Sequence, residues 1–214
     1  MAGAGLACLA ACILIGLAVN RRETWLDGAL LVVAKHLVSR HGVLVRALGG
    51  EAYWPHGAYL TALLPLAVTV AALIWEAPQH GVVATIDRWR WVLLTLAAIP
   101  VHYALRMVFA RPGPAEGPDQ IDSIGAYPSG TALAVGLGWG LCLVVVGRLR
   151  PQWRPYLVIL AVIALVVHAA VRVVTHKHWA TDILGSYLLV ASAFLLAGVV
   201  RPGDGRLPAL VEDQ

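Results

Sequence analysis

Charged residues are scarce in this sequence, and their scarcity excludes most classes of soluble protein. Only 13% of its 214 residues are Asp, Glu, Lys or Arg, whereas 59% are apolar, and the mean hydropathy is +0.76. Soluble domains carry about 25% charged residues, and disordered chains are poor in apolar residues. The composition therefore predicts an integral membrane protein.

Cysteines and metal-ligand spacings are also scarce. The three cysteines, Cys8, Cys12 and Cys142, lie within apolar runs, where a thiol acts as a small hydrophobic group. No CxxC pair or Cys/His spacing is present, so the sequence predicts no disulfide scaffold, no metal and no other cofactor. The net charge of +4 is modest, and without a basic stripe bearing interleaved aromatics we expect no nucleic-acid partner. The lipid bilayer is the partner that the sequence predicts.

Long runs without charge divide the chain. A helix needs about 20 residues to cross a hydrocarbon core of about 30 Å, and tryptophans, which favour the headgroup region, stand at or near most run ends. We expect an all-α, six-transmembrane-helix bundle forming one domain over residues 1–214, with a frayed tail over 201–214. The expected spans are 2–20, 56–75, 91–110, 129–147, 156–174 and 182–200.

Between the first two spans, Glu23 to Gly49 has apolar residues at helical spacing with basic residues between them. This pattern predicts an interfacial amphipathic helix. The positive-inside rule places the arginine-bearing loops 77–90 and 148–155 in the cytoplasm, so the connections 111–128 and 175–181 share the outer face. This topology places the basic residues of the amphipathic segment outside, and their position there argues against the topology. We expect a multi-pass protein of the cell (inner) membrane with its functional face outside.

The connection before the last span carries Arg172, His178 and Asp182. Charged groups at membrane depth are costly and usually mark function, and a carboxylate four residues after a histidine can hold one imidazole tautomer. Such an imidazole could be a nucleophile or a base. A purely structural interpretation is equally open: His176 and Lys177 would lie in the headgroups, and Asp182 would cap the helix.

The connection before the fourth span carries Arg111-Pro112 and then Pro128-Ser129-Gly130. Free N–H groups at a helix start, with a serine hydroxyl, can cradle an oxyanion, although this is also an ordinary helix cap. Two arginines, a helix N-terminus and a histidine backed by a carboxylate on one membrane face would together suit a phosphate.

These residues resemble the type-2 phosphatidic-acid phosphatase superfamily of integral membrane lipid phosphatases. The family signature is Lys-x6-Arg-Pro, then Pro-Ser-Gly-His, then Ser-Arg-x5-His-x3-Asp, on a six-helix core with its site at the outer face. Arg111-Pro112, Pro128-Ser129-Gly130 and Arg172-x5-His178-x3-Asp182 match in order and spacing. The resemblance implies that His178 attacks phosphorus while Asp182 orients it. It also implies that the phosphoryl oxygens are held by Arg111, Arg172, Ser129 and Gly130, without a metal.

The sequence departs from the family at three positions. Ala104 replaces the family lysine, Thr131 the histidine, and Val171 the serine. On a continuous helix, the side chain of Arg106 would point about 140° and that of His102 about 180° around the axis from Arg111. These angles argue against either side chain as a replacement for the positive charge of the family lysine. The family histidine at the Thr131 position protonates the departing oxygen, and a threonine hydroxyl is no acid near neutral pH. His176 is the other auxiliary candidate.

Leaving-group chemistry then favours one substrate class. A phosphate monoester expels an alkoxide, which needs a general acid, whereas a lipid diphosphate expels a phosphate monoester whose second pKa is about 6. The sequence therefore predicts a phosphatase that removes the terminal phosphate of a prenyl or polyprenyl diphosphate through a phosphohistidine.

Three other functions stay open. The alternative that Ala104 and Thr131 favour most is a catalytically degenerate family member that binds a lipid phosphate or a membrane partner. An intramembrane serine hydrolase would use Ser129 with His168 or His178, but it leaves Arg111 and Arg172 unexplained. Metal transport would use His102, His176, His178 and Asp182. The oligomeric state has no signature in the sequence.

Overall fold

The structure is a computed structural model that describes residues 1–20, 23–36, 61–75, 92–93, 95–114 and 125–198. Within these ranges the regular structure is helical. The elements are α1 (Ala2–Val19), a helix over 25–36, the helix Thr61–Trp75, α4 (Ala98–Phe109), α5 (Gly130–Leu149), the short 3-10 helix η1 (Pro151–Trp153), α6 (Arg154–Val174) and α7 (Ala180–Ala197). The loop 77–90, the second half of the amphipathic segment and the tail 201–214 lie outside the described residues.

Four of the described helices are long and apolar enough to cross a membrane: Ala2–Val19, Gly130–Leu149, Pro151–Val174 and Ala180–Ala197. Two others, Thr61–Trp75 and Ala98–Phe109, are apolar but shorter. At 1.5 Å per residue, the 12 residues of α4 cover about 18 Å, less than a hydrocarbon core of about 30 Å. The expected count of six spans is therefore not confirmed, although a helix overlaps each of the six predicted ranges.

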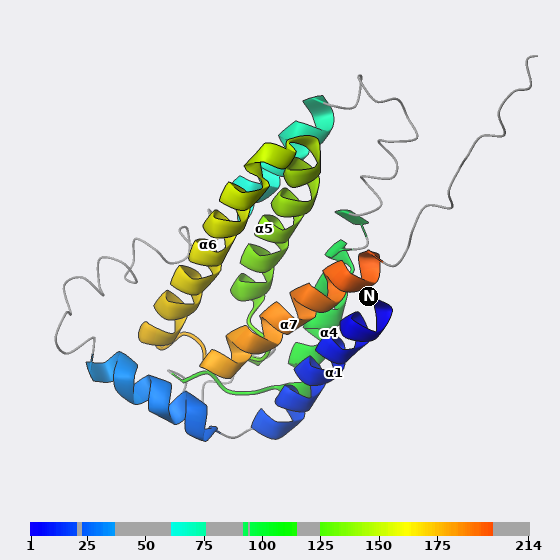
Figure 1. Cartoon of the computed structure of the whole chain (residues 1–214). Helices are drawn as coiled ribbons and strands as arrows, with labels where there is room; N and C mark the ends of the chain where they lie inside the picture. Colours follow the sequence, from blue (N-terminus) through cyan, green and yellow to red (C-terminus); the bar gives the residue numbers. More distant parts are fainter. Residues whose placement is uncertain (21–22, 37–60, 76–91, 94, 115–124, 199–214) are drawn as a thin grey trace, which may run out of the picture.

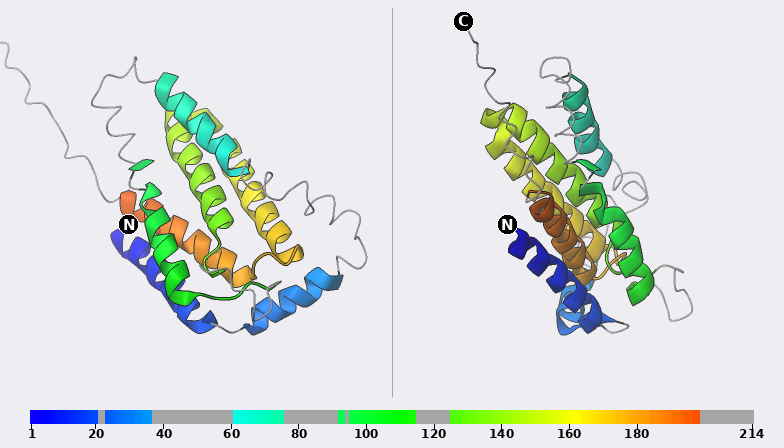
Figure 2. Two further views of the ribbon diagram at one scale, coloured as in Figure 1. Left: turned by 180° about the vertical axis from the view of Figure 1, so that it is seen from behind. Right: turned by 90° about the vertical axis from the view of Figure 1, so that its right-hand side faces the viewer.

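The helices α5 and α7 pack against each other, and each also packs against a further helix. The helix α1 lies along α7, and α5 packs against both α6 and α7 (Figures 1 and 2). Small residues allow this close approach: a Cβ on Gly136 would lie 2.9 Å from a Val190 methyl carbon. The helix Thr61–Trp75 packs on the far half of α5 through Leu73, which contributes to a buried cluster with Leu141 and Val145.

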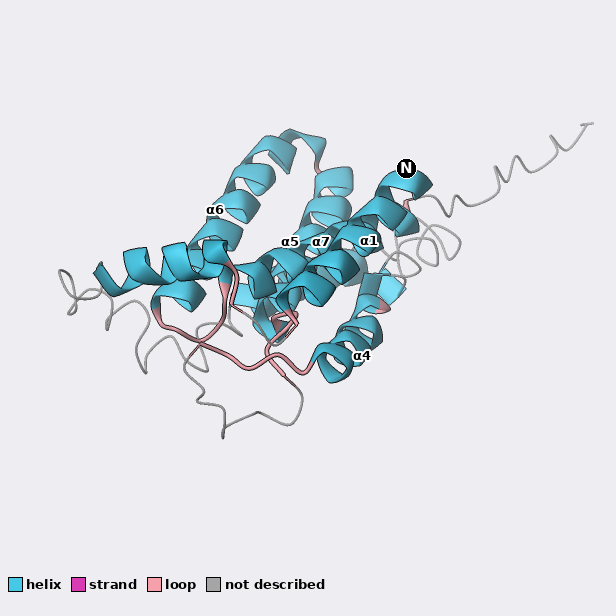
Figure 3. Ribbon diagram, turned by 90° about the horizontal axis from the view of Figure 1, so that it is seen from below, coloured by secondary structure: helices cyan, strands magenta, loops and turns pink. Residues whose placement is uncertain are grey.

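The functional connections meet at one end of this bundle. The C-terminal ends of α4 and α6 and the N-terminal ends of α5 and α7 lie together at the bottom of Figure 1, and the helix over 25–36 crosses beneath them. Seen from below, the loop segments that link these ends face the viewer (Figure 3). Residues from four separate stretches of sequence are thus brought to one end of the molecule.

Tyr127 anchors one of these loops in the core. Its side chain is completely buried, its ring packs edge-on against Phe109 with centroids 5.4 Å apart, and its hydroxyl donates to the Cys12 carbonyl of α1. Gly16 and Gly185 leave the space for the ring, because a Cβ on either would collide with it. The loop before α5 is therefore fixed by α1 and α7 together.

Candidate functional site

The C-terminal end of α4 sets the position of Arg111. The helix stops at Phe109, and Ala110 adopts a left-handed conformation with φ 41° that carries the chain away from the helix axis. The Ala126 amide donates to the Arg111 carbonyl at 2.6 Å, so the segments on either side of residues 115–124 lie side by side. Gly125 is required here: its φ is 79°, and a Cβ would lie 2.7 Å from the Ala110 backbone.

Ser129 caps the start of α5. Its hydroxyl accepts from the Ala132 amide at 3.4 Å and lies 3.4 Å from the Thr131 hydroxyl. Its backbone joins α5 to α7, since its amide donates to the Asp182 carbonyl at 3.1 Å and its carbonyl accepts from the Ser186 hydroxyl at 2.8 Å. Ser129 thus has the capping role that the sequence allowed, and it also ties the two helix starts together.

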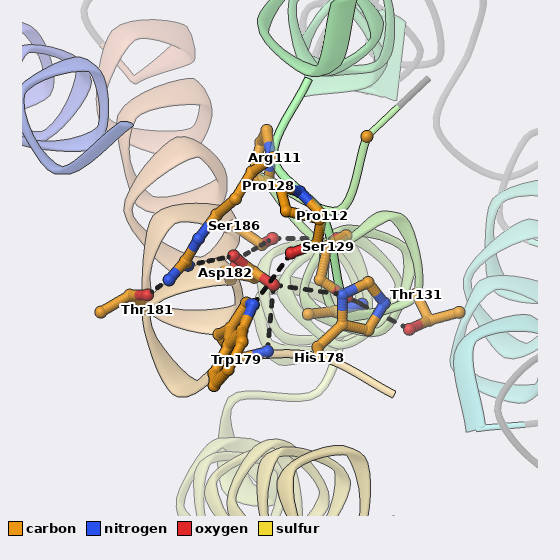
Figure 4. A network of polar contacts seen from close by, with 12 residues as sticks. Arg111, Pro112, Pro128, Ser129, Thr131, His178, Trp179, Thr181, Asp182 and Ser186 are labelled. Carbon is orange, nitrogen blue, oxygen red and sulfur yellow. Dashed lines mark hydrogen bonds and ion pairs between the residues drawn. The ribbon is translucent and has the colours of Figure 1, made fainter. Parts of the chain in front are cut away.

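His178 and Asp182 face each other across the start of α7 (Figure 4). His178 Nδ1 lies 3.5 Å from Asp182 Oδ2, and no hydrogen bond forms between them in this geometry. The same carboxylate oxygen accepts from the Trp179 amide at 3.0 Å, which caps the helix. Asp182 is therefore both a cap and, among the described residues, the carboxylate beside the imidazole. Contacts of this kind are often long without a ligand and tighten when one binds.

Arg111 lies behind this pair between two carboxylates. Its guanidinium is 1% exposed and donates to Asp182 Oδ1 and to Asp27 Oδ2, each at 2.7 Å. It also donates to the Thr181 hydroxyl at 2.7 Å and lies 5.3 Å from the centre of the Trp179 ring. Figure 4 shows Arg111 directed at Thr181 and Asp182. The second carboxylate, Asp27, belongs to the helix over 25–36 and was not foreseen as a site residue.

A cavity of about 490 Å³ opens on the other side of His178. Cationic and imidazole side chains from three elements line it, together with the first turn of α5 and apolar residues of α4 and α5. The polar lining residues are His102, Arg106, Thr131, Arg172, Lys177 and His178. Among the described residues that line it there is no carboxylate, so this part of the cavity suits an anion.

The protonation of His178 follows from these surroundings. Burial lowers the pKa of His178 below its usual value, Asp182 opposes this shift, and the guanidinium groups of Arg172 and Arg106 reinforce it. The imidazole is thus neutral at pH 7 and keeps a lone pair. For Asp27, burial alone would raise the pKa, but hydrogen bonds from Arg111, Thr181 and Thr24 lower it, so this group is a carboxylate.

The predicted site residues separate into two sets. His178, Arg172, Gly130 and the auxiliary Thr131 line the cavity. Arg111, Ser129 and Asp182 lie behind these residues and are not among the lining residues. The other auxiliary candidate, His176, is not a lining residue either; it has a left-handed φ of 55°.

Arg106 and His102 lie where the sequence predicted that they would not. The prediction assumes a single helix through Arg111, but the left-handed Ala110 ends that helix, so angles counted around one helix do not apply. Both side chains line the cavity. Arg106 donates to the Gly125 carbonyl through Nε at 2.7 Å, and His102 Nε2 lies 3.0 Å from the Pro128 carbonyl oxygen. Their i, i+4 spacing is the signal that could have identified them.

Within the described parts of the chain, no group of three or more His, Cys, Asp or Glu side chains is placed to hold a metal ion. The chemistry available at the cavity is that of a neutral imidazole beside cations and a helix N-terminus. Such an arrangement can bind a phosphoryl group and offer it a nitrogen nucleophile.

Comparison with known proteins identifies the fold. No protein-family model matches this chain, and no curated protein matches it. Among solved structures, the chain is similar to the crystal structure of a transmembrane PAP2-type phosphatidylglycerolphosphate phosphatase from Bacillus subtilis. The TM-score is 0.67 at 16% sequence identity, over 91% of this chain and 94% of that chain. This similarity shows that the two chains share a fold, which agrees with the family resemblance of the sequence motifs.

Proposed function

We propose that this chain is a membrane lipid phosphatase that removes the terminal phosphate of a prenyl or polyprenyl diphosphate. The observation that carries the proposal is the cavity itself, in which a neutral His178 lies among Arg106, Arg172 and Lys177. The fold shared with a lipid phosphatase and the apolar helices around the cavity support a lipid substrate.

The first chemical step is attack by His178 on the terminal phosphorus. The Nε2 lone pair forms the N–P bond, and the bond from phosphorus to the bridging oxygen breaks with its electron pair on the departing prenyl monophosphate. The Nδ1 proton stays on the ring, toward Asp182. Water then attacks the phosphohistidine: the O–P bond forms, the N–P bond breaks with its electron pair on Nε2, and both water protons leave with the product as dihydrogen phosphate, which releases one of them to solvent according to the pH. Neutral His178, still carrying its Nδ1 proton, is regenerated.

The phosphate ligands in this proposal are those that line the cavity. Arg172 and the Gly130 amide at the α5 start hold the phosphoryl oxygens, as the family resemblance implies, and Arg106 supplies the charge that Ala104 lacks. Arg106 Nη1 is near the α5 start, 3.8 Å from where a Cβ on Gly130 would be. Arg111 and Ser129 hold the surrounding backbone and Asp182 in place.

Thr131 carries the choice of substrate class. It lines the cavity at the position of the family histidine, and its hydroxyl cannot protonate an alkoxide. A diphosphate needs little such help, because its leaving group is a weakly basic phosphate. The similar Bacillus subtilis protein is named for a different lipid phosphate, phosphatidylglycerolphosphate, so monoesters belong in the test.

We further propose that the chain is one domain, residues 1–214, in the inner membrane, with six spans and its cavity facing outward. The helix over 25–36 supports an interfacial segment, because its Asp27 end contacts Thr181 in the first turn of α7 while Leu30 and Val33 line an apolar groove against α6 and α7.

Phosphate release by the purified protein in detergent tests the function. Farnesyl or undecaprenyl diphosphate, phosphatidic acid and phosphatidylglycerol phosphate are compared, each with and without EDTA. We expect release from diphosphates that survives EDTA, is inhibited by orthovanadate and is abolished by His178→Ala. His36→Ala, an exposed histidine on the helix over 25–36, is the matched control and should retain activity. Tight binding of a lipid diphosphate without any release would instead identify a degenerate binding protein.

A further inference from the structure

We propose that Asp27 is a positioning residue for the reaction, acting through Arg111 and Thr181 on Asp182 and so on His178. This inference rests on the proposed function. It assigns a task to a residue outside all three motifs, and it makes Arg111 part of the support of Asp182 instead of a direct ligand of phosphate.

The geometry places both oxygens of Asp27 on groups that hold Asp182. Oδ1 accepts from the Thr181 amide at 3.1 Å and from its hydroxyl at 3.0 Å, while Oδ2 accepts from Arg111 at 2.7 Å. Thr181 directly precedes Asp182, and Arg111 donates to Asp182 Oδ1 at 2.7 Å. The carboxylate plane of Asp182 is thus fixed from two directions, which leaves Oδ2 facing His178.

Asp27 is itself held rigidly. It is 2% exposed and forms a capping box with Thr24 at the start of the helix over 25–36: the Thr24 hydroxyl donates to Asp27 Oδ2 at 2.8 Å, and the Asp27 amide lies 3.2 Å from that hydroxyl. A carboxylate locked at a helix start and buried against a guanidinium has little freedom. It can therefore transmit a defined position to the groups it contacts.

Charge gives Asp27 a second effect on His178. Asp182 alone would be neutralised by Arg111, whereas two carboxylates around one guanidinium leave a net charge of −1 behind the imidazole. When His178 attacks phosphorus, its ring becomes positively charged. A negative charge at that place stabilises the ring in the transition state, so removing Asp27 should slow the chemical step and leave substrate binding unchanged.

The imidazole also faces groups that oppose this effect. The titratable and charged groups around it are Asp182 from α7, Arg172 and His168 from α6, Arg106 and His102 from α4, and Lys177 beside it in the loop. Most of them are cations or imidazoles. The carboxylates behind Arg111 are therefore the main source of negative charge near His178 among the described residues.

The decisive variant is Asp27→Asn, with Glu23→Gln as its matched control. Glu23 is an exposed acid at the start of the same segment, so its variant makes the same change of charge outside the network. For Asp27→Asn we expect kcat to fall by about 10²-fold, as for a misplaced catalytic group, with KM unchanged. We expect the acid limb of kcat/KM to move to lower pH, because less negative charge lowers the pKa of His178. Asp27→Glu keeps the negative charge against Arg111 and so should fold. Its kcat should lie between that of the wild type and that of Asp27→Asn.

A second readout needs no turnover. Nitrogen-15 NMR of labelled histidines, with His178 assigned from His178→Gln, should show the His178 titration shifted to lower pH in Asp27→Asn and unshifted in Glu23→Gln. A wild-type protein that releases no phosphate would refute the proposed function alone, because this titration would still report on Asp27. An unshifted titration with wild-type kcat in Asp27→Asn, or a raised KM with kcat unchanged, would overturn the positioning role.

Discussion

Introducing an acid where the chain lacks one gives the sharpest test of the substrate class. Thr131 lies in the first turn of α5, lines the cavity beside His178 and has its hydroxyl 3.4 Å from Ser129 Oγ. Because the side chain borders a cavity of about 490 Å³, Thr131→His has open space to occupy. The new imidazole would lie where the family histidine protonates the leaving oxygen.

The expected gain depends on the leaving group. General acid catalysis is typically worth about 10²–10⁴-fold, which is about 2.7–5.4 kcal/mol of activation free energy at about 1.36 kcal/mol per tenfold. Hydrolysis of phosphatidic acid, which expels an alkoxide, should rise by at least about 10²-fold. Release from farnesyl diphosphate should change little, since its leaving group has a pKa of about 6.

Initial rates of phosphate release on both substrates measure this ratio, and Thr131→Gln controls for size and hydrogen bonding without an acid. Equal gains on both substrates would show that the imidazole contributes charge and not a proton. A wild-type preference for phosphatidic acid over every diphosphate would refute the substrate argument. His102 also lines the cavity, so a selective loss of monoester hydrolysis in His102→Gln would show that an acid is already present.

Two further predictions concern binding and pH. Arg106→Ala should raise KM for the diphosphate by about 10- to 10²-fold, because a hydrogen bond to a charged group contributes about 1.5–3 kcal/mol. The control variant Arg148→Ala, at the far end of α5, should leave the steady-state kinetics unchanged. Equal effects of the two variants would contradict a specific contact between Arg106 and phosphate. Because the pKa of His178 is lower in the folded chain than its unfolded value of about 6.5, the unfolded chain binds the extra proton. Stability is therefore fully present above about pH 6.5 and falls below it, and thermal unfolding in detergent should show this loss in wild type and a weaker loss in His178→Gln.

The sequence predicts the helices well because the bilayer imposes a simple requirement. A buried backbone must satisfy its hydrogen bonds within a helix, so apolar runs such as 129–147 and 182–200 coincide with α5 and α7 to within about three residues. The end of α4 was harder to predict. An alanine gives no sequence signal for a left-handed conformation, yet Ala110 adopts one. The wrong prediction for the positions of Arg106 and His102 follows directly from this missing signal.

The residues of the candidate site could be predicted where they lie close together in the sequence, at the spacing of a known motif. Arg172, His178 and Asp182 fall in one short connection, so their spacing alone indicates that they meet. Asp27 has no such signal, because its partners Arg111 and Thr181 are 84 and 154 residues away. Only the tertiary arrangement of the helices brings it to them.

The anchoring of Tyr127 has a consequence for biosynthesis. Its ring and hydroxyl need Gly16 and Cys12 from the first helix and Gly185 from the last, so the loop before α5 cannot take its final shape until both ends of the chain are in the membrane. Helices enter a bilayer in chain order, so assembly of the end of the bundle that carries the candidate site would be a late event. A chain lacking α1 or released before α7 would be delivered to the membrane as an incomplete bundle with the Tyr127 anchor unmade, and a chain released before α7 would also leave Arg111 without its partner Asp182. We expect membrane proteases to distinguish such a state from the finished protein.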